Sequence, residues 1–165
     1  MGEYPEKAEA SNLVNEAAEA YAIAPQNKVL RFLGISGSQP QSNTNQAFLS
    51  IIRGGLPRHS LDSLMEKTEM SIYEMADILN TTDRTLRRYE ADVKLNREQS
   101  ERLVELAQLY TRGEQVFGNA VGFKQWMASE IPSLGNKKPK SFLDTSLGIG
   151  LLLDELTRIE LGVFA

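Results

Sequence analysis

The segment that most constrains the fold spans residues 71–88 and reads SIYEMADILNTTDRTLRR. Ser71 and Glu74 form the S-x-x-E pattern of a capping box, in which two side chains satisfy free amide groups at the start of a helix. Apolar side chains then recur at helical spacing, at Ile72, Met75, Ile78 and Leu79. These features predict a short helix that buries one face.

The same segment predicts a second helix that crosses the first after a tight turn. Ala76 is small where two helices must approach closely, Asn80 can take the left-handed conformation of a sharp turn, and Leu86 faces inward. Thr82 can cap the second helix, and Asp83 complements the positive end of its dipole. The pattern as a whole predicts a helix-turn-helix.

The outward face of the second helix is the predicted DNA-binding surface. A guanidinium group can bind a phosphate, or guanine O6 and N7 in the major groove, through two hydrogen bonds at once. Arginines on one helix face can also form a solvated surface, and similar helix pairs occur in proteins that do not bind DNA. The predicted contact residues are Thr82, Arg84, Thr85, Arg87 and Arg88.

The charge of the chain limits how it could bind nucleic acid. The formal net charge is -4, and residues 60–112 carry eight basic against eleven acidic side chains. Because nonspecific affinity for nucleic acid comes from neutralised phosphates, a general nucleic-acid coat protein is excluded. Any DNA contact must be local, and we expect a homodimer to present two recognition helices together.

The sequence offers no candidate catalytic, metal or cofactor site. The only histidine, His59, lies next to Pro57 in an expected loop, and cysteine is absent. There is no glycine-rich phosphate loop, H-E-x-x-H or EF-hand motif, and Asp144, Asp154 and Glu155 are not backed by other ligands. We therefore expect a protein that is not an enzyme. With no signal peptide and no membrane segment, we expect it in the cytoplasm.

Helical patterns along the chain predict an all-α protein in three parts. Residues 1–45 read as a helical extension with a linker, residues 46–112 as the helix-turn-helix region, and residues 113–165 as a C-terminal domain. The apolar run 29–33 is left open between a strand and a docking segment. Ser60 is expected to cap the helix that precedes the helix-turn-helix.

The C-terminal half is expected to form one long helix, one short helix and a final helix. The long helix runs from Arg97 to about Phe117, Asn119 begins the short one, and the last ends at Gly162. Leu147, Leu151, Leu152, Leu156 and Ile159 mark the apolar positions of the final helix. The aromatic set of Phe117, Phe123 and Trp126 favours a core over a ligand cage, because it lies at helical spacing among aliphatic residues.

Several motifs of the C-terminal half occur in an order and spacing shared with one family. They are residues 96–103 (NREQSERL), 116–118 (VFG) with Trp126, 134–139 (LGNKKP), 142–145 (FLDT) and 158–165 (RIELGVFA). Together they resemble the Xre/MbcA/ParS antitoxins over roughly residues 50–165, and residues 1 to about 45 are not covered. The chain departs from the family at Asn80 and Asn136, where glycine is frequent, and at Tyr89, where many members carry another basic residue.

The resemblance implies an antitoxin of a type II toxin-antitoxin pair whose toxin is a RES-domain protein that consumes NAD or transfers from it. In this family an Xre/Cro-like helix-turn-helix commonly dimerises and represses the operon by binding its operator DNA. A helical C-terminal domain binds the toxin, blocks its NAD pocket and joins it in a higher-order complex. The matching DNA-binding positions are the helix at residues 82–88, and the matching toxin contacts are the last helix and the tail.

The tail also has a physical interpretation of its own. We expect Phe164 and the carboxylate that follows to enter or seal the toxin's nucleotide pocket, with Asp154 and Arg158 at the rim. Considered without the resemblance, Val163 and Phe164 could instead fold back on the core. The full set of predicted toxin contacts is Asp154, Arg158, Gly162, Val163, Phe164 and Ala165.

Two other functions remain open from the sequence. The chain could be a freestanding repressor whose C-terminal half serves for dimerisation. It could also be a protein-binding adaptor that has lost DNA binding, an alternative that the acidic balance of residues 60–112 keeps open. A neighbouring gene for a RES-type protein would favour the antitoxin.

Overall fold

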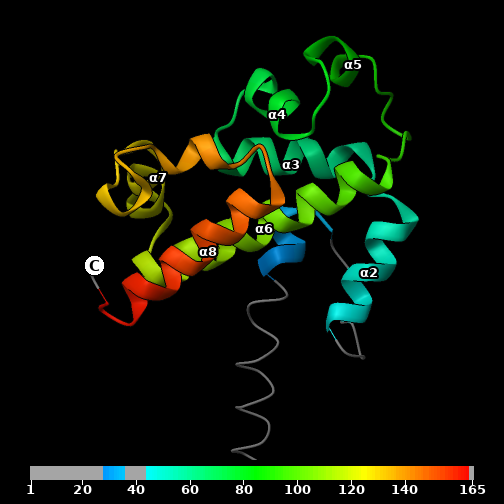
Figure 1. Cartoon of the computed structure of the whole chain (residues 1–165). Coiled ribbons are helices and arrows are strands. Elements are labelled where there is room, and N and C mark those ends of the chain that lie inside the picture. Colours follow the sequence, from blue (N-terminus) through cyan, green and yellow to red (C-terminus); the bar gives the residue numbers. More distant parts are fainter. Residues whose placement is uncertain (1–27, 36–43, 164–165) are drawn as a thin grey trace, which may run out of the picture.

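The computed structural model describes residues 28–35 and 44–163, and this part of the chain is helical and contains no strand (Figure 1). The predicted helical extension in residues 1–27 and most of the predicted linker lie outside the described residues. The helices are α2 (Thr44–Gly54), α3 (Arg58–Thr68), α4 (Ile72–Ile78), α5 (Asp83–Arg87), α6 (Arg97–Phe117), α7 (Ala120–Ala128) and α8 (Ser146–Glu160), with two 3₁₀ turns, η1 (Pro132–Leu134) and η2 (Pro139–Phe142). The all-α prediction is confirmed.

The long helix α6 organises the core. Its start is fixed by a capping box in which Asn96 and Gln99 exchange side-chain and backbone hydrogen bonds, and it ends at Gly118, whose φ of 75° is left-handed. It packs against α2, α3, α7 and α8. Figure 1 shows α8 running beside α6, with α4 and α5 above α3 at the opposite side. Leu103, Leu106 and Leu109 of α6 are fully buried, so most elements share one hydrophobic core.

The apolar run at residues 29–33 is a docking segment, and it is not a strand. Residues 28–32 are helical, and Val29, Leu30, Phe32 and Leu33 are buried. The ring of Phe32 lies 6.3 Å from that of Tyr110 on α6. The segment therefore extends the core rather than crossing the surface as part of a linker.

The expected start of α3 was wrong by three residues, because the N-cap is Pro57 and not Ser60. The helix begins at Arg58 after Pro57, so Ser60 lies inside the first turn and is fully buried. The N–H of Arg58 donates to the carbonyl of Val93 at 3.0 Å, so a distant segment satisfies the helix start in place of a side-chain cap. His59 is exposed, but it lies in α3 and not in the expected loop.

Candidate functional site

The helix-turn-helix is assembled by the local contacts that the sequence predicted. The carboxylate of Glu74 accepts the N–H of Ser71 at 2.8 Å, and the hydroxyl of Ser71 accepts the N–H of Glu74 at 3.2 Å. The hydrogen bond from the Ser71 backbone, followed by the Lys140 ammonium, holds the pKa of Glu74 below its usual range. The reciprocal capping box therefore fixes the start of α4.

The turn between α4 and α5 has the predicted geometry. Asn80 takes a left-handed φ of 49°, and the N–H of Thr81 donates to the carbonyl of Ala76 at 2.9 Å. Leu86 is fully buried and Ala76 is nearly so, which locks α5 against α4. The helix-turn-helix prediction is confirmed.

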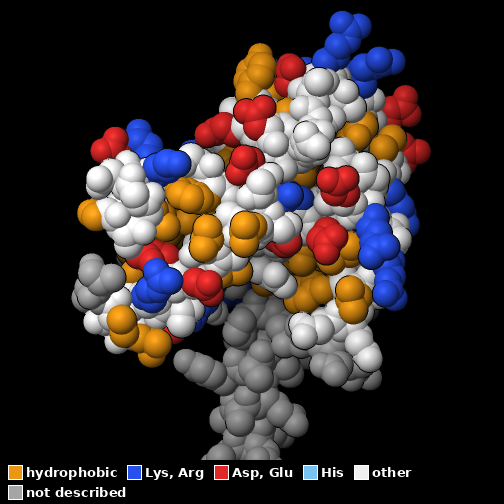
Figure 2. Space-filling view, in the orientation of Figure 1, with side chains coloured by type: hydrophobic (Ala, Val, Ile, Leu, Met, Phe, Trp, Pro, Cys, Tyr) orange, Lys and Arg blue, Asp and Glu red, His pale blue; other side chains and the backbone are white. Residues whose placement is uncertain are grey.

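The residues of the predicted DNA-binding surface all lie exposed on or beside α5. Thr82 caps the helix, since its hydroxyl accepts the N–H of Thr85 at 3.1 Å, and the two threonine hydroxyls lie 2.9 Å apart. In the described part of the chain, Arg84 and Arg88 take no part in an ion pair. These two guanidinium groups are therefore available to an anionic partner. Figure 2 shows Lys and Arg side chains projecting at the top of the molecule, above α5.

Arg87 differs from the other two arginines because the protein itself holds it. Its Nε lies 3.4 Å from a carboxylate oxygen of Asp83, and its guanidinium lies 5.7 Å from the centre of the Tyr73 ring. Tyr73 stands on α4 with 63% of its surface exposed. Sequence reasoning missed Tyr73, because its contact with Arg87 depends on the crossing angle of the two helices.

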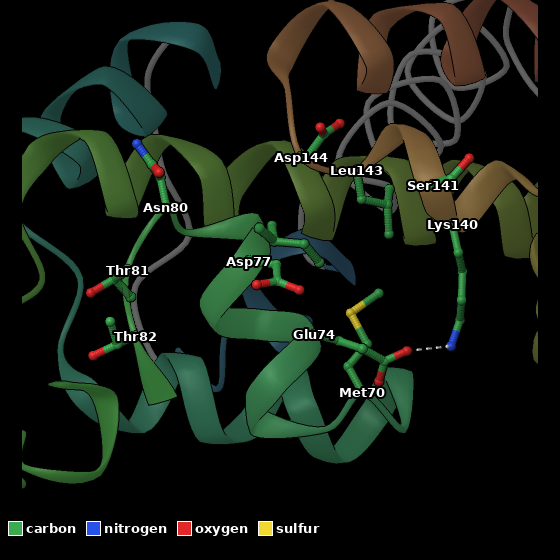
Figure 3. A pocket seen from close by; sticks show the side chains of 11 residues that line it. Met70, Glu74, Asp77, Asn80, Thr81, Thr82, Lys140, Ser141, Leu143 and Asp144 are labelled. Atoms are coloured by element: carbon green, nitrogen blue, oxygen red, sulfur yellow. Dashed lines mark hydrogen bonds and ion pairs between the residues drawn. The ribbon is translucent and has the colours of Figure 1, made fainter. Parts of the chain in front are cut away.

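Two ion pairs connect the helix-turn-helix to the C-terminal region. The ammonium of Lys140, in η2, lies 3.1 Å from the carboxylate of Glu74, and that of Lys124, on α7, lies 2.6 Å from Glu69. Beside the first pair is a cavity of about 700 Å³ between α4, the turn after it and η2. Figure 3 shows Lys140 reaching across to Glu74 from the far wall of this cavity. Glu74, which caps α4, thus also contacts the C-terminal region.

Helix α8 has two apolar faces, one buried and one exposed. Ile149, Leu152 and Leu156 are buried, whereas Leu147 is 77% and Leu151 is 44% exposed. The exposed leucines share their face with two of the predicted toxin contacts, at the helical spacing of Leu147, Leu151, Asp154 and Arg158. Figure 2 shows hydrophobic side chains at the surface along this helix.

The apolar positions that predicted this helix divide between its two faces. Leu147 and Leu151 lie on the solvent side, whereas Leu152 and Leu156 lie in the core. The signal was present in the spacing, since positions 147, 151, 154 and 158 form one stripe and positions 149, 152 and 156 another. We refer below to Leu147, Leu151, Asp154 and Arg158 as the α8 face.

A second, mostly apolar cavity of about 390 Å³ lies at the C-terminal end of α8, and we call it the C-terminal pocket. Its floor holds Glu155, which is 7% exposed, accepts a hydrogen bond from the hydroxyl of Ser133 and pairs with Arg158 at 3.0 Å. The buried carboxylate is thus satisfied within the protein. The apolar walls are Phe117, Trp126, Ile131, Pro132, Ile159 and Val163.

The predicted aromatic core is confirmed, and it borders this pocket. The ring of Phe123 is fully buried and lies 5.8 Å from that of Trp126, which in turn lies 5.8 Å from that of Phe117. Phe117 is only partly buried. The cluster joins α6 to α7 and forms one side of the C-terminal pocket.

The chain leaves α8 through a Schellman motif. Gly162 has a left-handed φ of 67°, its N–H donates to the carbonyl of Ile159 at 3.1 Å, and the N–H of Val163 donates to that of Arg158 at 2.9 Å. Arg112 of α6 binds the Glu160 carboxylate through both terminal guanidinium nitrogens and holds the pKa of Glu160 below its usual range. Of the predicted tail contacts, Gly162 and Val163 are exposed, and Phe164 and Ala165 lie outside the described residues.

Within residues 28–35 and 44–163, no group of three or more histidine, aspartate and glutamate side chains could hold a metal ion. No helix in the same part of the chain has the length and hydropathy needed to cross a membrane.

The two regions match two family models. Residues 47–108 match the antitoxin Xre-like helix-turn-helix domain, and residues 112–162 match the antitoxin Xre/MbcA/ParS C-terminal toxin-binding domain. A relative described as antitoxin Xre, from Yersinia enterocolitica, is 34% identical over 95 residues. That alignment covers 54% of this chain and 64% of the relative, so the chain spans a little under two thirds of the relative's length.

Proposed function

Because the chain belongs to the family of Xre-type antitoxins, we propose that it binds and neutralises a cognate RES-domain toxin that consumes NAD or transfers from it. It does so by blocking the toxin's active site with the end of α8 and the tail. The observation that carries the proposal is the match of residues 112–162 to a toxin-binding domain.

The α8 face supports this proposal on physical grounds. Leu147 and Leu151 expose apolar surface to water, which is typical of an interaction site. Asp154 and Arg158 place opposite charges beside this surface. An apolar centre with a polar rim is the usual composition of a protein interface. We propose that Arg158, Gly162, Val163, Phe164 and Ala165 continue this contact toward the toxin's nucleotide pocket.

We further propose that α5 binds operator DNA of the chain's own operon and represses it, with the chain acting as a homodimer. Arg84 and Arg88 would make the main contacts, because both are exposed and neither is taken up by an ion pair among the described residues. Thr82, Thr85 and Arg87 would lie at the edges of the same surface. Their internal bonds leave them less free to rearrange.

Co-expression with the product of the neighbouring gene tests the antitoxin function. We expect the full chain to restore growth and to co-purify with the toxin. Deletion of residues 162–165 should release toxicity while circular dichroism still shows an intact helical fold. Full neutralisation by the truncated chain would argue against a role for the tail.

The matched control for the tail is Val121→Ser. Val121 is 66% exposed on α7 and does not line the C-terminal pocket, so its replacement removes exposed apolar surface elsewhere in the domain. We expect this variant to neutralise the toxin as the full chain does. If the chain forms no complex with any neighbour but binds its promoter in a gel shift, the freestanding repressor becomes the better assignment.

A further inference from the structure

The C-terminal pocket lies at the point where the described chain ends. Val163, the last described residue, lines the cavity together with Ile159 from the preceding turn of α8. The residue that follows it in sequence is Phe164. Phe164 is therefore joined by one peptide bond to a residue that lines this cavity.

The Schellman motif ends α8 and places Val163 at the pocket. The bond from the Val163 N–H to the Arg158 carbonyl spans five residues and, with the left-handed Gly162, stops the helix before Val163. The backbone therefore holds Val163, the residue before Phe164, at an apolar cavity.

The chemistry of the cavity suits an aromatic ring. Its walls are mostly aliphatic and aromatic, and its volume of about 390 Å³ exceeds that of one phenylalanine side chain. The carboxylate on its floor, Glu155, already pairs with Ser133 and Arg158. An apolar occupant therefore leaves no polar group of the pocket without a partner.

We propose that Phe164 occupies the C-terminal pocket of its own chain when no toxin is bound, and that it leaves the pocket when the tail engages the toxin. Only the release of Phe164 on toxin binding rests on the proposed function; the docking of Phe164 in the free chain does not. The docked ring covers Trp126 and Ile159. The pocket and the toxin therefore compete for the Phe164 side chain. Docking in cis then lowers the apparent affinity for the toxin by the fraction of chains whose tail is free.

Trp126 reports on the pocket directly, because it is the only tryptophan of the chain and it forms part of the wall. The experiment measures the emission maximum of Trp126 and its quenching by acrylamide in the purified full chain without toxin. We expect Phe164→Ala to shift the emission to longer wavelength and to raise the quenching constant. Phe164→Leu, which keeps an apolar side chain, should lie between wild type and Phe164→Ala.

Leu147→Ala is the matched control, because Leu147 is an exposed apolar residue of α8 that does not line the pocket. It should leave both fluorescence readings unchanged, and circular dichroism should show the same helix content in all variants. Identical emission and quenching for Phe164→Ala and wild type would overturn the inference. So would a signal that depends on protein concentration and not on Phe164, since a second copy would then cover the pocket.

Addition of toxin separates this inference from the proposed function. If Phe164 leaves the pocket when toxin binds, wild type and Phe164→Ala should give the same Trp126 signal at saturating toxin. A Phe164-dependent signal in the free chain with no toxin binding would retain the docked tail and reject the antitoxin role. Toxin neutralisation with no Phe164-dependent signal would retain the antitoxin role and reject the docked tail.

Discussion

Substitution of Gly113 by alanine tests how tightly α6 and α7 are packed. A Cβ atom at this position would lie 2.3 Å from two atoms of the Phe123 ring and 2.4 Å from a third. The ring is fully buried, with Tyr110 at 5.1 Å and Trp126 at 5.8 Å between ring centres. No side chain end is free to swing away, so either the aromatic cluster or the helix pair has to shift.

Two opposing effects determine the size of the change. Overpacking a well-packed core costs about 1–3 kcal/mol, while replacing glycine by alanine inside a helix gains about 1 kcal/mol. The added Cβ would lie within 2.5 Å of three buried ring atoms of Phe123, so the overpacking cost should lie at the upper end of its range. We therefore expect Gly113→Ala to lower the free energy of unfolding by about 1–2 kcal/mol.

Urea denaturation followed by Trp126 fluorescence and far-ultraviolet circular dichroism measures this difference. Gly150→Ala is the matched control, because it lies inside α8 and an added Cβ would meet no atom within 4 Å. The control should gain about 0.5–1 kcal/mol, since only the helix propensity changes. The packing argument fails if Gly113→Ala unfolds at the same urea concentration as wild type or at a higher one.

Three further predictions follow from the same geometry. Glu74→Gln should lower stability at neutral pH by up to about 1 kcal/mol. The pKa of Glu74 in the folded state is depressed below 4.5, so its carboxylate stabilises the fold above that pH. In urea denaturation at a series of pH values, the difference in stability from wild type should vanish as the pH falls through the folded pKa. A difference that stays constant with pH would exclude the carboxylate as the cause. Leu151→Ser should leave the melting temperature nearly unchanged but weaken the toxin complex in calorimetry, whereas unaltered affinity would remove Leu151 from the interface. Lys124→Ala should hardly change stability at high salt, because its partner Glu69 is 74% exposed; a large, salt-independent loss would contradict this.

Local features could be predicted from the sequence because they depend on residues within one turn of each other. The capping box at Ser71, the left-handed turn at Asn80 and the cap at Thr82 involve partners no more than five residues apart. The same holds for α6, whose start and end were predicted at Arg97 and Phe117. Caps and turns carry their own chemistry, so neighbouring side chains suffice to identify them.

The remaining features depend on contacts that sequence spacing does not encode. Ser60 has a good residue type for a cap, but Val93, far along the chain, satisfies the start of α3 instead. Lys140 and Glu74 are 66 residues apart, and nothing in either segment indicates that they pair. The C-terminal pocket likewise requires α7, η1 and α8 to be placed before it exists.

The structure of α5 also bears on how much DNA affinity one chain can provide. The helix has five residues and is followed by Arg88 at its C-cap. Asp83 and Tyr73 hold Arg87, which leaves Arg84 and Arg88 to neutralise phosphates. Glu90 and Asp92 follow soon after in the sequence and are exposed. Their carboxylates repel the DNA phosphates at the edge of the same surface. Because phosphate neutralisation supplies most of the affinity, two free arginines give weak binding at physiological salt. We therefore expect operator binding only from an assembly that presents at least two copies of α5, with a salt dependence about twice as steep as that of one chain.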